Sequence, residues 1–181
     1  MNRHLHTGMA AAVMLAALLS ACASTSTQRS TGQSVDDGVL TSKINAALIR
    51  NDQTKARQIN VEVYKGEVQL NGFVDSAEAK AAASTATRSV EGVKSVQNNL
   101  QIRADRSAGQ AIDDTVITAR VKTALIGDSR TKASQIEVST NAGVVQLGGF
   151  VDSAASKSVA AELARAVDGV KSVQNELQVK N

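Results

Sequence analysis

The spacing of hydrophobic residues predicts a helix followed by a β-hairpin. Between residues 40 and 48 the apolar side chains fall at helical spacing, which places them on one face of a helix. Residues 59–64 and 67–74 largely alternate apolar with polar side chains, as half-buried strands do. Lys65-Gly66 separates the two stretches, and a two-residue connection with glycine favours a tight turn between antiparallel strands.

A second helix and a third strand complete the unit. Asp75-Ser76 supplies N-cap chemistry for an alanine-rich helix, and Gly92 ends it as glycine commonly does. Residues 95–102 alternate again as a strand. Because a helix between two strands implies a right-handed crossover between parallel strands, the sheet should be mixed. The predicted fold class is α+β: an α-β-β-α-β unit whose three-stranded mixed sheet has two helices on one face and Asn, Gln, Ser and Glu on the other.

The whole unit occurs twice, with an offset of 77 residues and no gap. Residues 92–98, for example, recur unchanged as residues 169–175. Such self-similarity indicates a duplicated domain. We expect a first domain at residues 35–103, a linker at 104–110 and a second domain at 111–181. Because a unit of about 70 residues is near the lower size for a self-sufficient core, the two domains are also expected to dock on each other.

The N-terminus has the features of a bacterial export signal. Residues 8–19 form an apolar run behind a short basic start, and the run is shorter than the roughly 20 residues that a transmembrane helix needs. Leu19-Ser20-Ala21-Cys22 resembles a lipobox, whose cysteine thiol accepts a diacylglyceryl group. The expected organisation is a signal peptide at 1–21, then an acylated (palmitate-bearing) Cys22 and a flexible tether at 22–34. The alternative is an ordinary signal peptide with a chance cysteine.

The side chains available outside the signal argue against an enzyme. His4 and His6 are the only histidines and lie in the signal, and Cys22 is the only cysteine. The rest of the chain therefore has no imidazole base, no free thiol and no Cys/His zinc site, and it has no glycine-rich phosphate loop. We predict no catalytic residue, no metal and no cofactor.

Two acidic pairs, Asp36-Asp37 and Asp113-Asp114, are the best remaining candidates for carboxylate chemistry. Each pair is expected just before a helix, where a carboxylate interacts favourably with the positive end of the helix dipole. This interpretation is preferred to a metal or catalytic role.

The charge balance does not favour nucleic acid as a partner. The chain has 20 Lys and Arg against 17 Asp and Glu, with no Trp, one Tyr and two Phe. A nucleic-acid binder usually shows a basic stripe and often stacking aromatics. Four basic residues flank the first helix of the second repeat, as candidate contacts for anionic lipid headgroups or as an ordinary solvated surface. They are Arg120, Lys122, Arg130 and Lys132.

Gly72-Phe73 and Gly149-Phe150 stand near the end of the second strand of each unit, with phenylalanine at an outward position. The preferred interpretation is a glycine bulge that lets both phenylalanines turn into the core. The alternative is an exposed aromatic contact for lipid or a protein partner.

These motifs, in this order, resemble the BON domain (bacterial OsmY and nodulation). The resemblance rests on Asp-Asp-x-x-Ile-Thr-x-x-Val-x-x-Ala-Leu in the first helix, Val-x-Leu-x-Gly-Phe-Val in the hairpin and Val-x-Gly-Val-Lys-Ser-Val-x-Asn before the last strand. It extends over both repeats. Tandem BON domains behind a lipobox are similar to outer-membrane BON lipoproteins, and the repeats are similar to osmotically inducible periplasmic BON proteins.

The resemblance implies a non-enzymatic envelope protein. We expect phospholipid-binding domains that support envelope integrity and osmotic stress tolerance, anchored by lipid at the periplasmic face of the outer membrane. Ala23, rather than Asp, after the cysteine implies the outer membrane. The alternative is a periplasmic chaperone or adaptor that binds envelope proteins through the polar sheet face and the sheet edges. The expected partners are the membrane, anionic phospholipid and envelope proteins.

Overall fold

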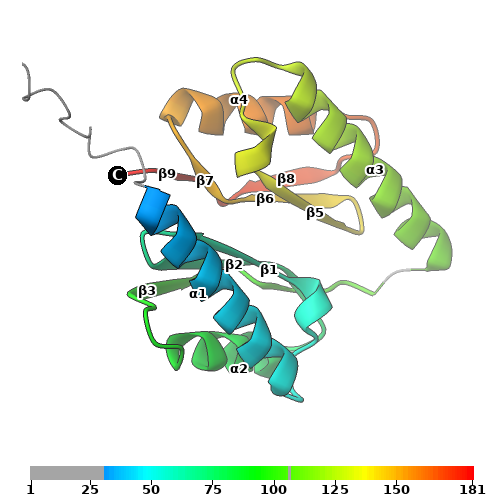
Figure 1. Cartoon of the computed structure of the whole chain (residues 1–181). Helices are drawn as coiled ribbons and strands as arrows, with labels where there is room; N and C mark the ends of the chain where they lie inside the picture. Colours follow the sequence, from blue (N-terminus) through cyan, green and yellow to red (C-terminus); the bar gives the residue numbers. More distant parts are fainter. Residues whose placement is uncertain (1–30, 106) are drawn as a thin grey trace, which may run out of the picture.

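The chain forms two domains with the same order of elements in the computed structural model, which describes residues 31–105 and 107–181 (Figure 1). The helices are α1 (Thr31–Arg50), α2 (Ala77–Arg88), α3 (Ala108–Gly127) and α4 (Ala154–Arg165), and the short 3-10 helices are η1 (Ala56–Gln58) and η2 (Ala133–Gln135). The strands of the first domain are β1 (Ile59–Tyr64), β2 (Glu67–Val74), β3 (Ser95–Asn98) and β4 (Gln101–Ile102). Those of the second are β5 (Glu137–Asn141), β6 (Val144–Gly148), β7 (Phe150–Val151), β8 (Ser172–Asn175) and β9 (Gln178–Val179). The α+β class and the tandem α-β-β-α-β order are thereby confirmed.

Each domain has a mixed sheet, as predicted. In the first domain β2 pairs antiparallel with β1 and parallel with both β3 and β4. In the second domain β6 pairs antiparallel with β5 and parallel with β8, while β7 pairs parallel with β9. The third strand is interrupted after Asn98 and after Asn175. Each of these side chains accepts a hydrogen bond from the backbone two residues later and donates one to a carbonyl of the second helix.

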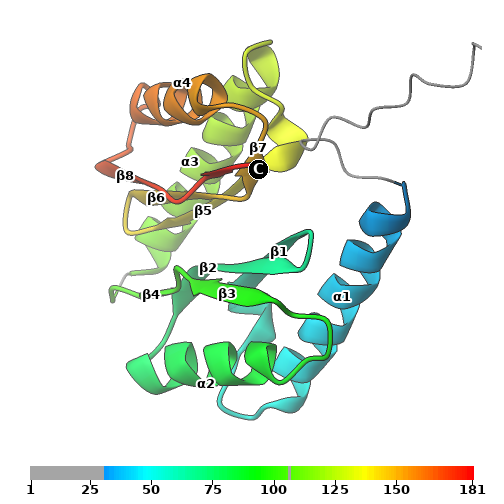
Figure 2. The same ribbon diagram turned by 90° about the vertical axis from the view of Figure 1, so that its left-hand side faces the viewer.

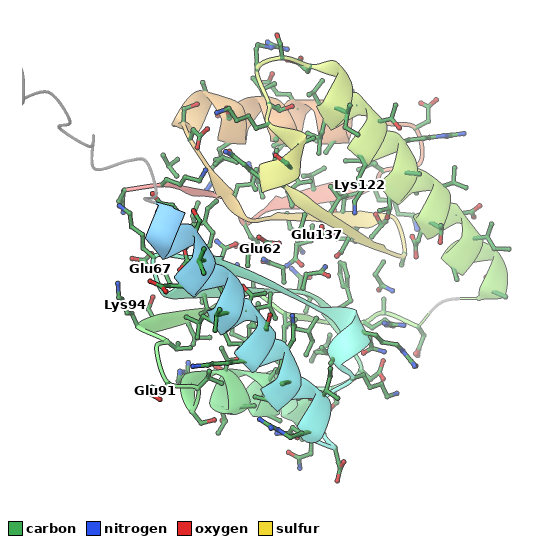
Figure 3. The ribbon with its side chains drawn as sticks, in the orientation of Figure 1. Glu62, Glu67, Glu91, Lys94, Lys122 and Glu137 are labelled. Atoms are coloured by element: carbon green, nitrogen blue, oxygen red, sulfur yellow. The ribbon has the colours of Figure 1, made fainter. Side chains whose placement is uncertain are left out.

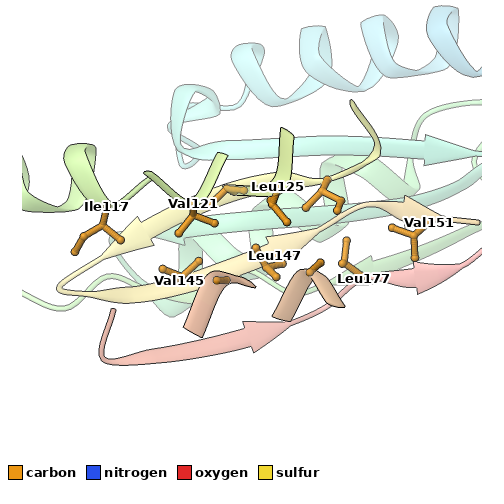
Figure 4. Close-up of a cluster of buried hydrophobic side chains, with 11 residues drawn as sticks. Ile117, Val121, Leu125, Val145, Leu147, Val151 and Leu177 are labelled. Carbon is orange, nitrogen blue, oxygen red and sulfur yellow. The ribbon is translucent and has the colours of Figure 1, made fainter. Parts of the chain in front are cut away.

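The core of each domain lies between its two helices and one face of its sheet. In the second domain Val121 and Leu125 of α3 pack against Leu147 of β6 and Leu177, and all four are almost fully buried (Figure 4). The repeat-equivalent positions form the core of the first domain. They are Ile44, Leu48, Leu70 and Leu100. The helical spacing read from the sequence therefore identifies the buried face of α1 correctly.

The helix starts differ from the sequence prediction. Helix α1 begins at Thr31, inside the predicted tether 22–34, and α3 begins at Ala108, inside the predicted linker 104–110. Ser107 caps α3 through a capping box with Gln110. Helix α3 begins early because this local capping and the alanine and glutamine residues of its first turn support helix before the apolar spacing starts. The predicted N-caps of the second helices, Ser76 and Ser153, do accept the expected backbone hydrogen bonds.

The two domains face each other through the polar sides of their sheets. Figure 2 shows the layers: α2 and α4 lie on the outside, and the two sheets lie between them. The buried residues Gln69 of β2 and Gln146 of β6 are repeat equivalents that make reciprocal contacts. Gln146 Oε1 accepts from the Gly72 N–H at 2.6 Å, and Gln69 Oε1 accepts from the Gly149 N–H at 2.9 Å. Their side-chain nitrogens donate across the interface to carbonyl oxygens at 2.7 and 3.1 Å, those of Asn99 and Glu176.

Two glycines shape this interface. Gly72 and Gly149 have φ of +123° and +120°, a conformation that residues with a side chain rarely adopt. A Cβ at either position would collide with a backbone carbonyl of the same domain, that of Gln58 or Gln135. The glycines therefore allow close approach within the domain while they present their N–H groups to the opposite one.

Phe73 and Phe150 are buried, as predicted, but neither belongs to the hydrophobic cluster of its own domain. The Phe150 ring lies 5.5 Å from the ring of Tyr64 in the first domain, measured between centroids. The outward position of these residues places them on the polar side of the sheet, and that side is buried because the other domain covers it.

Candidate functional site

A surface groove occurs at the same place in both domains. It is bounded by the first helix, the hairpin turn and the loop that leads into the third strand, and its volume is 410 Å³ in the first domain and 320 Å³ in the second. All ten residues that line the first groove have their repeat equivalents among the eleven that line the second. We call these the first groove and the second groove. The duplication has preserved a surface feature as well as a core.

A buried aspartate forms the floor of each groove. Asp37 of α1 accepts hydrogen bonds from the backbone N–H groups of Lys65 and Gly66 at 2.9 and 3.0 Å. Asp114 of α3 does the same for Ala142 and Gly143 at 2.9 and 2.8 Å. Both hairpin turns place two successive residues at positive φ, which directs these N–H groups at the helix.

The predicted helix-start role of the acidic pairs is therefore wrong. Asp36-Asp37 and Asp113-Asp114 lie inside α1 and α3, because both helices begin several residues earlier than expected. The second aspartate of each pair holds the first helix to the hairpin turn, and the first aspartate is exposed. No local sequence signal reveals this role, since the partners are 28 and 29 residues away.

Exposed aliphatic side chains stand on the first helix beside each groove. Val35 and Val39 of α1 are 60% and 51% exposed, and their equivalents Ile112 and Val116 of α3 are 66% and 43% exposed. We call these two pairs the groove rims. A spacing of four residues puts both members of a rim on one side of the helix. Exposed aliphatic residues that stand beside the same groove in both copies indicate a contact surface.

Basic residues lie beside both rims, in unequal number. The first groove is lined by Lys43, Lys65 and Lys94, and the second by Arg120 and Lys171, because Ala142 replaces Lys65. Each groove also has two acidic residues in addition to its floor aspartate, Asp36 and Glu91 or Asp113 and Asp168. Figure 3 shows Lys94 and Glu91 at the first groove. The first groove is therefore the more basic of the two by one charge.

The four residues predicted to contact lipid headgroups do not come together in one site. Arg120 lines the second groove. Lys122 turns instead toward Glu137 of β5, with Nζ 3.3 Å from the carboxylate (Figure 3). Arg130 pairs with Asp128 at 2.6 Å, and Lys132 pairs with Asp152 at 2.7 Å. Cys22, the predicted lipidation site, lies outside the described residues.

These ion pairs lower the pKa values of the aspartates that they involve. The Arg130 guanidinium lowers the pKa of Asp128 to about 2 by hydrogen bonding to it. The ammonium groups of Lys132 and then Lys180 hold the pKa of Asp152 well below its ordinary value of 3.8. Arg130 and Lys132 are consequently committed to neighbouring carboxylates at neutral pH, which makes them weaker candidates for a headgroup than Arg120.

The described residues contain no group of three or more His, Cys, Asp or Glu side chains placed to hold a metal ion. Within the same part of the chain, no helix combines the length and the apolar character needed to cross a bilayer.

The duplicated fold, with two α+β domains docked through their sheets and a groove in each copy, defines a class of tandem-domain proteins. The sequence pattern of the BON domain matches residues 36–104 and 113–181, and the chain belongs to the BON-domain family.

Three relatives are similar over most of their length. The osmotically-inducible protein Y of Escherichia coli is 39% identical over 86% of this chain and 78% of its own. The outer membrane lipoprotein DolP of Haemophilus influenzae is 35% identical over 80% of this chain and 75% of its own. A 21 kDa hemolysin of Actinobacillus pleuropneumoniae is 36% identical over 80% of this chain and 75% of its own.

Proposed function

We propose that this protein is a non-enzymatic envelope lipoprotein, anchored through acylated Cys22 at the periplasmic face of the outer membrane. Its two BON domains contact anionic phospholipid and support envelope integrity and osmotic stress tolerance. The names of two relatives, one osmotically inducible and one an outer membrane lipoprotein, support this assignment. The lipobox-like sequence before Cys22 supports the anchor.

The observation that carries the lipid proposal is the repeated groove with its rim. An aliphatic pair that can enter the headgroup region stands beside basic side chains that attract anionic headgroups. Each basic residue near such a surface contributes about 1 kcal/mol, and the attraction falls with salt. Because acidic residues share both grooves, binding by the domains alone should be weak and salt-sensitive. The ammonium of Lys65, the extra lysine, already donates to the Asn181 oxygen at 2.8 Å, so the two grooves should differ little in their attraction for anionic headgroups.

The alternative role, a chaperone or adaptor that uses the polar sheet face and the sheet edges, keeps only the sheet edges as a free contact surface. That face is buried between the domains through Gln69, Gln146 and their partners. A protein partner would have to bind at the sheet edges or separate the domains.

Serine substitution of both rims should weaken vesicle binding at least about tenfold, because burial of an aliphatic side chain is worth on the order of 1 kcal/mol or more. The variant carries Val35→Ser, Val39→Ser, Ile112→Ser and Val116→Ser in a form that begins at Ala23. Co-sedimentation with phosphatidylglycerol vesicles at low salt measures the affinity of the variant and of the parent, with phosphatidylcholine vesicles as the neutral comparison.

The matched control replaces Ile49 and Ile126, which are 70% and 74% exposed but lie outside both grooves. This control should bind as the parent does.

Arg120→Gln should weaken binding more than Arg130→Gln, since Arg130 is paired with Asp128. Equal and negligible binding of the parent to both kinds of vesicle would remove the lipid part of the proposal.

A Cys22→Ala substitution tests the anchor separately. The parent chain should fractionate with outer membranes, whereas the variant should lose its acyl chains and its membrane association, because two or more acyl chains are what hold a lipoprotein stably. Membrane fractionation with mass spectrometry of the N-terminal peptide measures both properties. An unacylated parent chain, or a variant that fractionates like the parent, would contradict the proposal.

A further inference from the structure

The docked domains leave a polar crevice on one side of their interface. Its volume is 420 Å³. From the first domain, Arg57, Asn60, Phe73 and Arg103 line it, and the second domain contributes residues of β5 that include Asn141. The crevice is separate from both grooves, which lie beside α1 and α3.

The repeat symmetry explains why this space is open. On the opposite side of the interface the equivalent of Asn141 is Tyr64, whose buried ring packs 5.5 Å from the ring of Phe150. The ammonium of Lys180, the equivalent of Arg103, lies 5.8 Å from the centre of the same tyrosine ring. Asparagine is much smaller than tyrosine and leaves the corresponding space beside Phe73 open.

The crevice contains buried polar atoms without a hydrogen-bond partner among the described residues. They include Nδ2 of Asn141, Nε of Arg103 and Oε1 of Gln58. Asn141 is only 3% exposed, and its Oδ1 is held by the N–H of Ala104 at 2.9 Å, so its amide group is fixed in place. Two of the three atoms are donors, and a buried donor without an acceptor is unfavourable.

The charges around the crevice favour an anion. Arg57 makes no ion pair with any residue that the structure describes, whereas Glu137, the acidic residue of the lining, is engaged by Lys122. Arg103 Nε lies 3.7 Å from Asp75 Oδ1, beyond hydrogen-bond distance, while Lys55 contacts Asp75 at 2.6 Å. Arg103 Nη2 donates to the Phe73 carbonyl oxygen at 3.3 Å. The crevice therefore has a positive charge, that of Arg57, without a described counter-charge, and most of its unpartnered polar atoms are donors.

We propose that the crevice binds a small oxyanion, a carboxylate or phosphate group, between the two domains. Arg57 and Arg103 supply guanidinium donors suited to such a group, and the Asn141 amide supplies a fixed neutral donor. An occupant that touches both domains stabilises their docked arrangement, because it binds only when they are together.

The test follows backbone amide shifts by NMR in the form that begins at Ala23. Inorganic phosphate, glycerol 1-phosphate and acetate are titrated separately, against sodium chloride at matched ionic strength. Saturable shifts are expected at residues 57–60, 103–104 and 139–141. Binding of glycerol 1-phosphate alone would point to a lipid headgroup, binding of both phosphates to free phosphate, and binding of acetate to a carboxylate ligand.

Two variants and one control make the outcome specific. Arg57→Gln should weaken binding about tenfold, the loss of one charge-assisted contact. Asn141→Tyr should abolish binding by filling the space as Tyr64 does on the other side. Arg88→Gln, an exposed arginine at the end of α2, should leave binding unchanged. If Asn141→Tyr fails to fold, Arg57→Gln decides the result. Shifts no larger than those with chloride, or equal affinity in Arg57→Gln, would show that water alone fills the crevice.

Discussion

Replacing Gln69 and Gln146 together with leucine should lower the free energy of unfolding by about 4 kcal/mol. Leucine is close to glutamine in size but cannot hydrogen-bond. The change leaves two glycine N–H groups and two carbonyl groups at the interface without their partners. Each buried polar group left unsatisfied costs about 1–3 kcal/mol, and partial access of water reduces the total.

Urea unfolding and small-angle X-ray scattering measure the effect together. The variant should unfold at lower urea, in two steps if the domains separate first, and its radius of gyration should increase. Gln53→Leu is the matched control, because that glutamine is exposed after α1. If the variant unfolds like the parent and stays equally compact, the glutamine contacts are not what holds the domains together.

Substitution of the second floor aspartate, Asp114→Ala, should destabilise the second domain by about 3 kcal/mol. Its carboxylate accepts two short backbone hydrogen bonds from the hairpin turn, and each bond to a charged group is worth about 1.5–3 kcal/mol. Without the carboxylate, the N–H groups of Ala142 and Gly143 lose the acceptor that fixes a turn with positive φ.

Asp113→Ala is the control for this substitution, since it removes the same charge at the next residue, where the side chain is exposed. Urea unfolding measures the change in the free energy of unfolding. Hydrogen exchange at the amides of Ala142 and Gly143 shows whether the hairpin turn is the part that is loosened. Asp114→Ala should speed exchange at both amides, whereas Asp113→Ala should not. Equal effects of the two substitutions would mean that charge near the helix start, rather than the contact with the turn, is what matters.

The docking arrangement decides which surfaces are free to act. Because the polar sheet faces are used between the domains, the outward surfaces are the helices, the grooves and the sheet edges. The first groove lies beside α1, the helix that follows the predicted acyl anchor. Each rim lies near the start of its helix, α1 or α3, and these two helices start on opposite sides of the two-domain molecule (Figure 1). A lipid contact and an occupant of the crevice would therefore use separate parts of the molecule.

The duplication, the order of elements, the mixed sheet and the buried face of each first helix can all be predicted from the sequence alone. These features follow from local periodicity and from capping chemistry within a few residues, so they can be read along the chain. The N-cap serines Ser76 and Ser153 and the core positions from Leu40 to Leu48 are examples.

The packing of the domains sets the roles of the remaining residues, which are Asp37, Asp114, Gln69, Gln146 and the two phenylalanines. Alternation marks one sheet face as polar but does not say whether water or another domain covers it, so Phe73 and Phe150 were expected in the cores. The aspartates contact turns 28 and 29 residues away, and the glutamines contact glycines 74 and 80 residues away. Periodicity describes only near neighbours, whereas contacts at these separations depend on how whole elements pack.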